Sequence, residues 1–214
     1  MIGDVINLEQ KHLETAENIY KIISETHQKP QKWSVGICGE SGSGKSVTAF
    51  ALKKVLEEKG IKSLVIQMDD YFKLPPKSNH ENRQKSLKNV GVHEVYLDKI
   101  QETVKKFKGG ESFITKPLVH YIENSVTEEV LKAEDIQVLI VEGTYVLDID
   151  DFDVSIFIDR TYKDTYENRM KRNRDVQSDF IERVLEIEHG IIRQLKEKAD
   201  LVLDKNYHII KSEL

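Results

Sequence analysis

The chain has 214 residues, of which 39% are hydrophobic and 32% are charged, a balance that suits one globular domain with room for a small lid. The formal net charge of −5 argues against a general nucleic-acid binder, because phosphate backbones select clustered Lys and Arg side chains. No apolar stretch approaches the roughly 20 residues that cross a bilayer, and the opening MIGDVINLEQ lacks the segments of a secretory signal, so we expect a cytoplasmic protein without a membrane partner.

The first expected elements are a helix, a strand and a second helix. Apolar residues at mostly helical spacing over residues 4–27 predict an amphipathic leading helix. The apolar run at residues 33–38 predicts a strand, and its Cys38, the single cysteine of the chain, is expected to be a buried core residue. A glycine-rich turn follows, and residues 45–59 are predicted to form a helix that Gly60 ends.

The next expected elements lead from a second strand to a third helix. Residues 64–68 predict a buried strand, with Asp69 and Asp70 at its carboxyl end. The polar, proline-containing segment that continues to about residue 90 is expected to be a loop. Residues 93–106 are predicted to be a helix.

The second half of the chain continues the alternation. Residues 112–122 and 126–131 either pair as a hairpin or form irregular loops. Continuous aliphatic runs predict strands at residues 138–141, 154–158 and 199–203. Helical periodicity predicts helices at residues 162–174 and 179–198.

Strands that alternate with helices predict an α/β fold with a mostly parallel, five-stranded sheet and helices on both faces. In such a sheet the ligand lies at the carboxyl ends of the strands. The glycine-rich turn and three acids, Asp69, Glu142 and Asp159, follow predicted strands directly. We therefore expect these four segments to meet at one edge of the sheet.

Residues 39–46 read Gly-Glu-Ser-Gly-Ser-Gly-Lys-Ser and fill the phosphate-loop pattern between a predicted strand and a predicted helix. Glycines allow backbone amides to turn toward phosphates, and a helix N-terminus adds positive potential. Lys45 is expected to reach the β and γ phosphates and the Ser46 hydroxyl to bind Mg²⁺. A flexible Ser/Gly turn is the alternative, which the strand and helix context disfavours. We expect ATP to be bound by Gly39, Ser41, Gly42, Ser43, Gly44, Lys45 and Ser46.

The loop predicts a three-layer P-loop NTPase fold over residues 33–214, preceded by the helix within residues 1–32. Such proteins include small-molecule kinases, GTPase switches and ATPase motors, and the fold alone does not choose among them. The chain has no Asn-Lys-x-Asp segment, since residues 203–206 carry Leu-Asp-Lys-Asn, and it has no LSGGQ-like stretch. A GTPase or a transporter ATPase is therefore disfavoured.

Several segments resemble the uridine kinase and phosphoribulokinase family of P-loop kinases, which includes pantothenate kinase and nicotinamide riboside kinase. The resemblance covers roughly residues 33–205, and its motifs are GESGSGKS, QMDDYFK, VLIVEGTYVL, IFID, RMKRNRD and ADLVLDKN. It implies ATP- and Mg²⁺-dependent phosphoryl transfer to a hydroxyl of a small molecule, with uridine or cytidine as the first acceptors. Pantothenate, a riboside or a sugar phosphate are alternative acceptors, and a nucleotide-binding ATPase or regulator is the alternative class.

The resemblance also implies roles for individual residues. Asp69 matches the acid that accepts the proton of the acceptor hydroxyl, with a helix cap or turn as its alternative role. Glu142 would hold Mg²⁺ together with Ser46, unless it is a strand-end surface acid. The basic run at residues 169–175 resembles an arginine-rich lid, in which Arg174 would stabilise the transferring charge; a solvated helix face is the alternative.

Acceptor recognition is the part of the family pattern from which this chain departs. The Asp-His-Pro element of uridine kinases is replaced by Gly-Val-His-Glu at residues 91–94, and the Arg-Gly-Arg after the lid by Val-Gln-Ser at residues 176–178. Aromatic and histidine side chains can stack on a base or bond a ribose hydroxyl, although surface loop residues would carry the same side chains. We expect the acceptor to contact Tyr71, His93, His120, Tyr121 and Arg169. The sequence leaves a homo-oligomer open.

Overall fold

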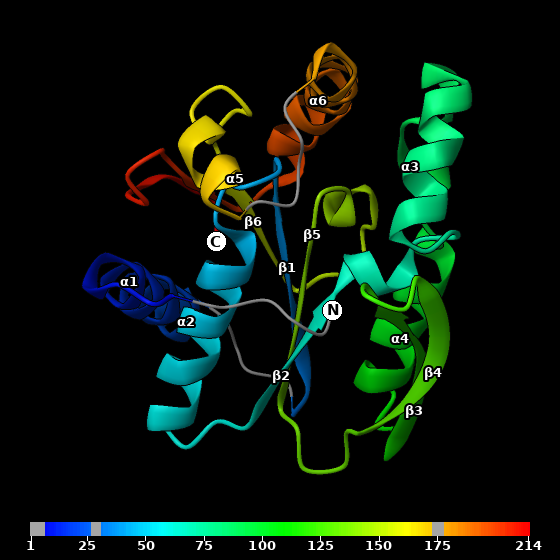
Figure 1. The fold of residues 1–214 in the computed structure, drawn as a ribbon. Coiled ribbons are helices and arrows are strands. Elements are labelled where there is room, and N and C mark those ends of the chain that lie inside the picture. Colours follow the sequence, from blue (N-terminus) through cyan, green and yellow to red (C-terminus); the bar gives the residue numbers. More distant parts are fainter. Residues whose placement is uncertain (1–6, 27–30, 173–177) are drawn as a thin grey trace.

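The computed structural model describes residues 7–26, 31–172 and 178–214. Its centre is a six-stranded sheet in the order β2-β5-β1-β6-β7-β8, in which the first five strands run parallel and β8 is antiparallel (Figure 1). The strands are β1 Trp33–Gly39, β2 Ser63–Gln67, β5 Val138–Gly143, β6 Val154–Ile158, β7 Leu201–Leu203 and β8 Ile209–Ser212. The five predicted strands are confirmed, and β8 is a sixth strand where the sequence predicted a polar end.

Helices cover both faces of this sheet, as the α/β prediction required. The described α-helices are α1 Gln10–Thr26, α2 Lys45–Glu58, α3 Pro76–Lys85, α4 Leu97–Lys108, α5 Tyr166–Arg172 and α6 Asp179–Ile192. Figure 1 shows α1 and α2 on one face and α4 on the other. Side chains alternate along each strand, so β1 and β5 supply apolar residues to a separate core on each face.

The leading helix α1 is shorter than predicted, and it lies against α2. Ala16, Ile19 and Ile23 of α1 are buried in the same apolar cluster as Leu52 of α2 and Val35 of β1. The amphipathic character inferred for this helix explains why one of its faces is buried. The division of the chain at residue 32 stays a prediction. None of the described helices is both long and apolar enough to cross a membrane.

The predictions for residues 70–132 needed correction in two places. The expected loop contains α3, whose ten residues PKSNHENRQK are almost entirely polar, so apolar periodicity could not reveal it. The next helix begins at Leu97 rather than at His93, after a short 3-10 turn at Val92–Glu94. The segments for which a hairpin and irregular loops were both open form an antiparallel hairpin, β3 Phe113–His120 with β4 Ser125–Lys132.

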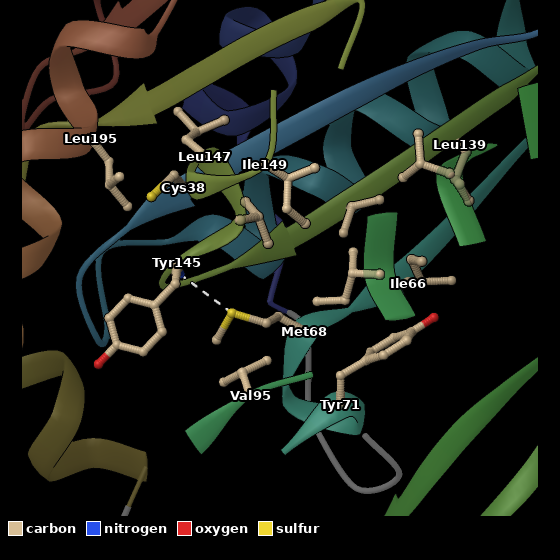
Figure 2. Packing of buried hydrophobic residues seen from close by; sticks show 14 of the residues in the cluster. Cys38, Ile66, Met68, Tyr71, Val95, Leu139, Tyr145, Leu147, Ile149 and Leu195 are labelled. Carbon is tan, nitrogen blue, oxygen red and sulfur yellow. Dashed lines mark hydrogen bonds between the residues drawn. The ribbon is translucent and has the colours of Figure 1, made fainter. Parts of the chain in front are cut away.

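The core beneath the carboxyl edge of the sheet positions the turn that follows β2. Met68 is fully buried there, and its sulfur accepts a hydrogen bond of 3.3 Å from the backbone N–H of Tyr145 (Figure 2). A Cβ atom at Gly143 would lie only 2.2 Å from Met68 Cβ. The glycine after Glu142 therefore lets the end of β5 and the turn after β2 approach each other closely.

Candidate active site

The predicted phosphate loop lies between β1 and the first residue of α2, as the motif requires. Gly42 and Gly44 have φ angles of 74° and 104°, in the region that glycine adopts without strain. Lys45 Nζ donates a 2.9 Å hydrogen bond to the carbonyl oxygen of Glu40. The Ser43 hydroxyl is buried and has no hydrogen-bond partner among the described residues. An unpaired polar atom of this kind, beside the backbone amides that begin α2, is consistent with a loop built to bind an anion.

Two predicted Mg²⁺ ligands meet beside the loop. The Ser46 hydroxyl donates a 2.8 Å hydrogen bond to Oε1 of Glu142, and Gln67 Nε2 donates to the same oxygen at 3.0 Å. The parallel register places Glu142 opposite both Ile37 of β1 and Gln67 of β2, so the sheet itself fixes the carboxylate. A hydroxyl and a carboxylate are hard oxygen donors of the kind that Mg²⁺ prefers. These residues therefore fit a magnesium ion bound next to a nucleotide.

The two adjacent acids after β2 have different environments. Asp69 is partly exposed and lines the pocket described below. Burial, and then the nearby charge of Glu142, raise the pKa of Asp69 from 3.8 to about 6, although Lys45 opposes this shift. Asp70 is buried, where it accepts hydrogen bonds from Lys116 Nζ at 2.7 Å and from the N–H of Val119 at 3.1 Å. Asp70 thus ties the β3–β4 hairpin to this turn, while Asp69 faces the pocket.

A pocket of about 980 Å³ opens at this edge of the sheet. Its floor contains Asp69, Glu142 and part of the phosphate loop. Two helices form its walls, α3 on one side and α6 on the other, and Figure 1 shows both beyond the carboxyl ends of the strands. The residues that line these walls are Pro76, Lys77, Asn79, His80, Glu81, Arg83 and Gln84 from α3, and Phe180, Ile181, Val184, Leu185 and Glu188 from α6.

The structure brings only some of the predicted acceptor residues to this pocket. Tyr121 and Arg169 line it, whereas His93 and His120 do not. The His120 ring nitrogen Nε2 instead bonds the hydroxyl of Thr127 across the hairpin at 2.9 Å. His93 lies in the short 3-10 turn at Val92–Glu94 and is not among the residues that line the pocket.

Tyr71 is also corrected, from an acceptor contact to a core residue. Its side chain is fully buried in the same apolar cluster as Met68 (Figure 2). Its hydroxyl shares a 3.1 Å hydrogen bond with the hydroxyl of Thr103. Arg169 is buried, and its Nη2 donates to the carbonyl of Tyr162 at 3.2 Å. Arg174, predicted to act in the lid, lies outside the described residues.

Sequence reasoning missed a buried charge network on the wall of the pocket. Arg83 of α3 bonds both oxygens of Glu94, with Nε–Oε1 and Nη2–Oε2 distances of 2.6 and 2.9 Å. Its Nη2 also bonds Glu188 Oε1 at 2.9 Å, and Asn79 Nδ2 donates to Glu94 Oε1 at 3.0 Å. The spacing of Asn79 and Arg83 puts them on one face of a helix, a signal that is legible only once α3 is known to be helical.

Comparisons with known proteins agree with this geometry. A model of the phosphoribulokinase / uridine kinase family matches residues 34–203. The chain is 28% identical over 196 residues to a uridine kinase of Escherichia fergusonii, a match that covers 84% of this chain and 90% of that one. It is 30% identical over 203 residues to the bifunctional alpha-galactosidase/sucrose kinase AgaSK of Mediterraneibacter gnavus, covering 84% of this chain but 22% of that longer protein.

Solved structures show the same fold. A possible uridine kinase from Bacillus stearothermophilus matches with a TM-score of 0.66 at 18% identity, over 88% of this chain and 97% of that one. A D-glycerate 3-kinase from Cryptococcus neoformans matches with a TM-score of 0.60 at 13% identity, over 94% and 98%. At these identities the structures support the fold and not the acceptor. Together with the family match, the phosphate loop and its neighbouring carboxylates show that the chain belongs to the phosphoribulokinase/uridine kinase family of P-loop kinases.

Proposed function

We propose that this chain transfers the γ-phosphoryl group of ATP to a hydroxyl of a small molecule bound between α3 and α6. The observation that carries this proposal is the position of Asp69, a pocket-lining carboxylate that shares the pocket with Lys45 and Ser46. Its pKa of about 6 makes it a better proton acceptor than an ordinary aspartate, while it remains largely ionised at pH 7. A phosphate-binding protein that only senses ATP has no need for such a group.

Each residue has a separate part in the transfer. Lys45 would contact the β and γ phosphates, and Ser46 and Glu142 would hold Mg²⁺, which neutralises phosphate charge when it is bound. Asp69 would orient the acceptor hydroxyl and take its proton as the new O–P bond forms and ADP leaves. Arg169 at the pocket wall, and Arg174 in the lid, would stabilise the charge of the transferring group.

Two acceptor classes have specific support. Similarity to uridine kinases over most of both chains favours a nucleoside such as uridine or cytidine. The 30% identity to a protein with sucrose kinase activity favours a carbohydrate instead. Pantothenate, other ribosides and sugar phosphates remain within the family's range.

A screen of ADP release tests the proposal. The full chain would be incubated with ATP and Mg²⁺, with nucleosides, sugars, vitamins and sugar phosphates added one at a time. We expect at least one compound to raise ADP release well above the background, and Asp69→Asn to remove that rise while ATP still binds. Hydrolysis that no acceptor changes would instead identify an ATPase or a nucleotide-dependent regulator.

A further inference from the structure

The two helical walls of the pocket carry a charge pair that the proposed transfer does not use. Arg83 of α3 and Glu188 of α6 both line the pocket, and their side chains are 15% and 13% exposed. Arg83 is also paired with Glu94, whose side chain is only 2% exposed. The pair therefore joins two helices that are more than ninety residues apart in the chain, directly at the proposed acceptor site.

The hydrogen bonds of Arg83 fix the orientation of its guanidinium plane, and their acceptors neutralise its charge. Within the described part of the chain, they occupy three of its five N–H donors: Nε and Nη2 on Glu94, and Nη2 again on Glu188. A guanidinium that forms two hydrogen bonds with one carboxylate and a third with another has little freedom to move toward a ligand. Two carboxylates also outweigh its single positive charge. Arg83 is thus a poor anchor for a phosphate or carboxylate, but a rigid donor.

Glu188 supplies the complementary acceptor. Its Oε1 receives the bond from Arg83, and no hydrogen bond between described residues involves its Oε2. Since Glu188 lines the pocket, this carboxylate can accept a hydrogen bond from a ligand hydroxyl. Lys77 and His80 also line α3's side of the pocket, but both are exposed, where water and salt screen their attraction for an anion.

The α6 wall adds apolar surface beside this pair. Val184 and Leu185 are buried, and Phe180 is partly buried with its ring edge-on to His80 at 5.5 Å between centroids. A sugar ring or a nucleoside presents C–H or aromatic faces next to hydroxyl groups, which matches an apolar wall beside a fixed donor and acceptor. An anionic group at the same place would meet Glu188 with like charge.

We propose that Arg83 and Glu188 bind neighbouring hydroxyls of the acceptor, and that they select an uncharged polyhydroxylated molecule over one that carries phosphate or carboxylate. This inference rests on the proposed kinase function and names the acceptor class for the same pocket. One hydroxyl donates to Glu188 while its neighbour accepts from Arg83. A site built around such buried polar groups rejects compounds that leave them unpaired.

The first test compares acceptors with the unmodified full chain. ADP release would be measured with uncharged compounds (uridine, cytidine, ribose, glucose and sucrose) and with anionic ones (ribulose 5-phosphate, glycerate and pantothenate). We expect kcat/KM for the best uncharged acceptor to exceed that of every anionic one by on the order of a hundredfold or more. Sugars and nucleosides form separate arms, so the result also separates these two sources of hydroxyls. A preference for an anionic acceptor would overturn this inference and leave the kinase proposal standing, whereas no response to any acceptor would remove both.

The second test is Glu188→Gln, with Glu186→Gln as the matched control. Glu186 lies on the same helix but is exposed and does not line the pocket. We expect Glu188→Gln to raise KM for the acceptor by roughly 10- to 100-fold, since a charge-assisted hydrogen bond is lost, with little change in ATP affinity. The control should behave like the unmodified protein. If Glu188→Gln weakened ATP binding and acceptor binding equally, Glu188 would be a purely structural residue and the proposal would be contradicted. If this variant folds poorly, the comparison of acceptors still tests whether the pocket selects uncharged molecules.

Discussion

Replacing Asp69 by asparagine should have opposite effects on activity and on stability. Asparagine keeps the size of the side chain but cannot accept the hydroxyl proton. Turnover with the acceptor should therefore fall by a factor on the order of a hundred or more, the usual worth of a positioned base. ATP should still bind, because Lys45 and the phosphate loop are unchanged. Catalytic side chains often lower the stability of the fold that holds them. Asp69→Asn is therefore expected to make the fold more stable.

The size of the stability gain follows from the pKa of Asp69. Burial raises this pKa from 3.8 to about 6, so the folded protein binds the proton more tightly than the unfolded chain does. The free energy of unfolding therefore falls as the pH rises from about 4 through 6. At pH 7 the ionised carboxylate destabilises the fold by at most about 3 kcal/mol, because each unit of pKa corresponds to about 1.4 kcal/mol. Part of this energy is offset by water in the pocket, since Asp69 is partly exposed.

Chemical and thermal unfolding without nucleotide or Mg²⁺ would measure this effect. We expect Asp69→Asn to raise Tm by a few degrees at pH 7, and the gain to disappear near pH 4, where the aspartate is protonated. Asp70→Asn gives the opposite control. It removes the closer of the two carboxylates paired with the buried Lys116, Asp70 at 2.7 Å and Glu129 at 3.2 Å, which should destabilise the protein by about 3 kcal/mol. Lower stability of Asp69→Asn at pH 7, together with intact acceptor phosphorylation, would refute the assignment of Asp69 as the base.

Three further changes test other parts of the site. Lys45→Ala should weaken ATP binding at least about tenfold and nearly abolish turnover, because a charged hydrogen bond to phosphate is lost; calorimetric titration would measure it, and equal affinity would contradict the phosphate-loop assignment. Arg174→Ala should lower kcat on the order of a hundredfold with little change in ATP affinity, and an effect limited to KM for ATP would make it a ground-state contact. Gly143→Ala should destabilise the fold by about 1–3 kcal/mol in urea unfolding, because its Cβ would lie 2.2 Å from Met68 Cβ; unchanged stability would mean that the turn can move.

The sheet and the phosphate loop were predictable because local signals specify them. Continuous aliphatic runs such as residues 138–141 become strands buried on both faces, and each ends at the edge where the ligand residues lie. The loop motif fixes the position of Lys45 and Ser46 relative to the strand that precedes them. Glu142 then follows from strand register, because parallel neighbours end together.

The pocket walls formed by α3 and α6 were not predictable, because polar contacts between residues far apart in the sequence hold them together. Helix α3 has hardly any apolar residues, and it is held through Asn79 and Arg83 to Glu94 and Glu188, which lie elsewhere in the chain. Tyr71 illustrates the complementary error. An aromatic residue two positions after the catalytic candidate suggested stacking, but the 3-10 turn at Met68–Tyr71 directs it into the core. The direction of a side chain in a short turn is not encoded in hydrophobic periodicity.

Two segments outside the family match, α1 and the chain after β7, help to support the phosphate loop. The match ends at residue 203, yet the hydroxyl of Tyr207 donates to the carbonyl of Ser43 at 3.0 Å and receives a 2.9 Å bond from Arg160 Nη1. Any Cβ at Gly44 would meet that hydroxyl at 2.1 Å, so the glycine serves this contact as well as the turn. Thr15 of α1 in turn donates to the carbonyl of Tyr207 at 3.0 Å. The leading helix and the chain after β7 therefore hold one aromatic side chain against the loop, which restrains the peptide between Ser43 and Gly44 where phosphate would bind.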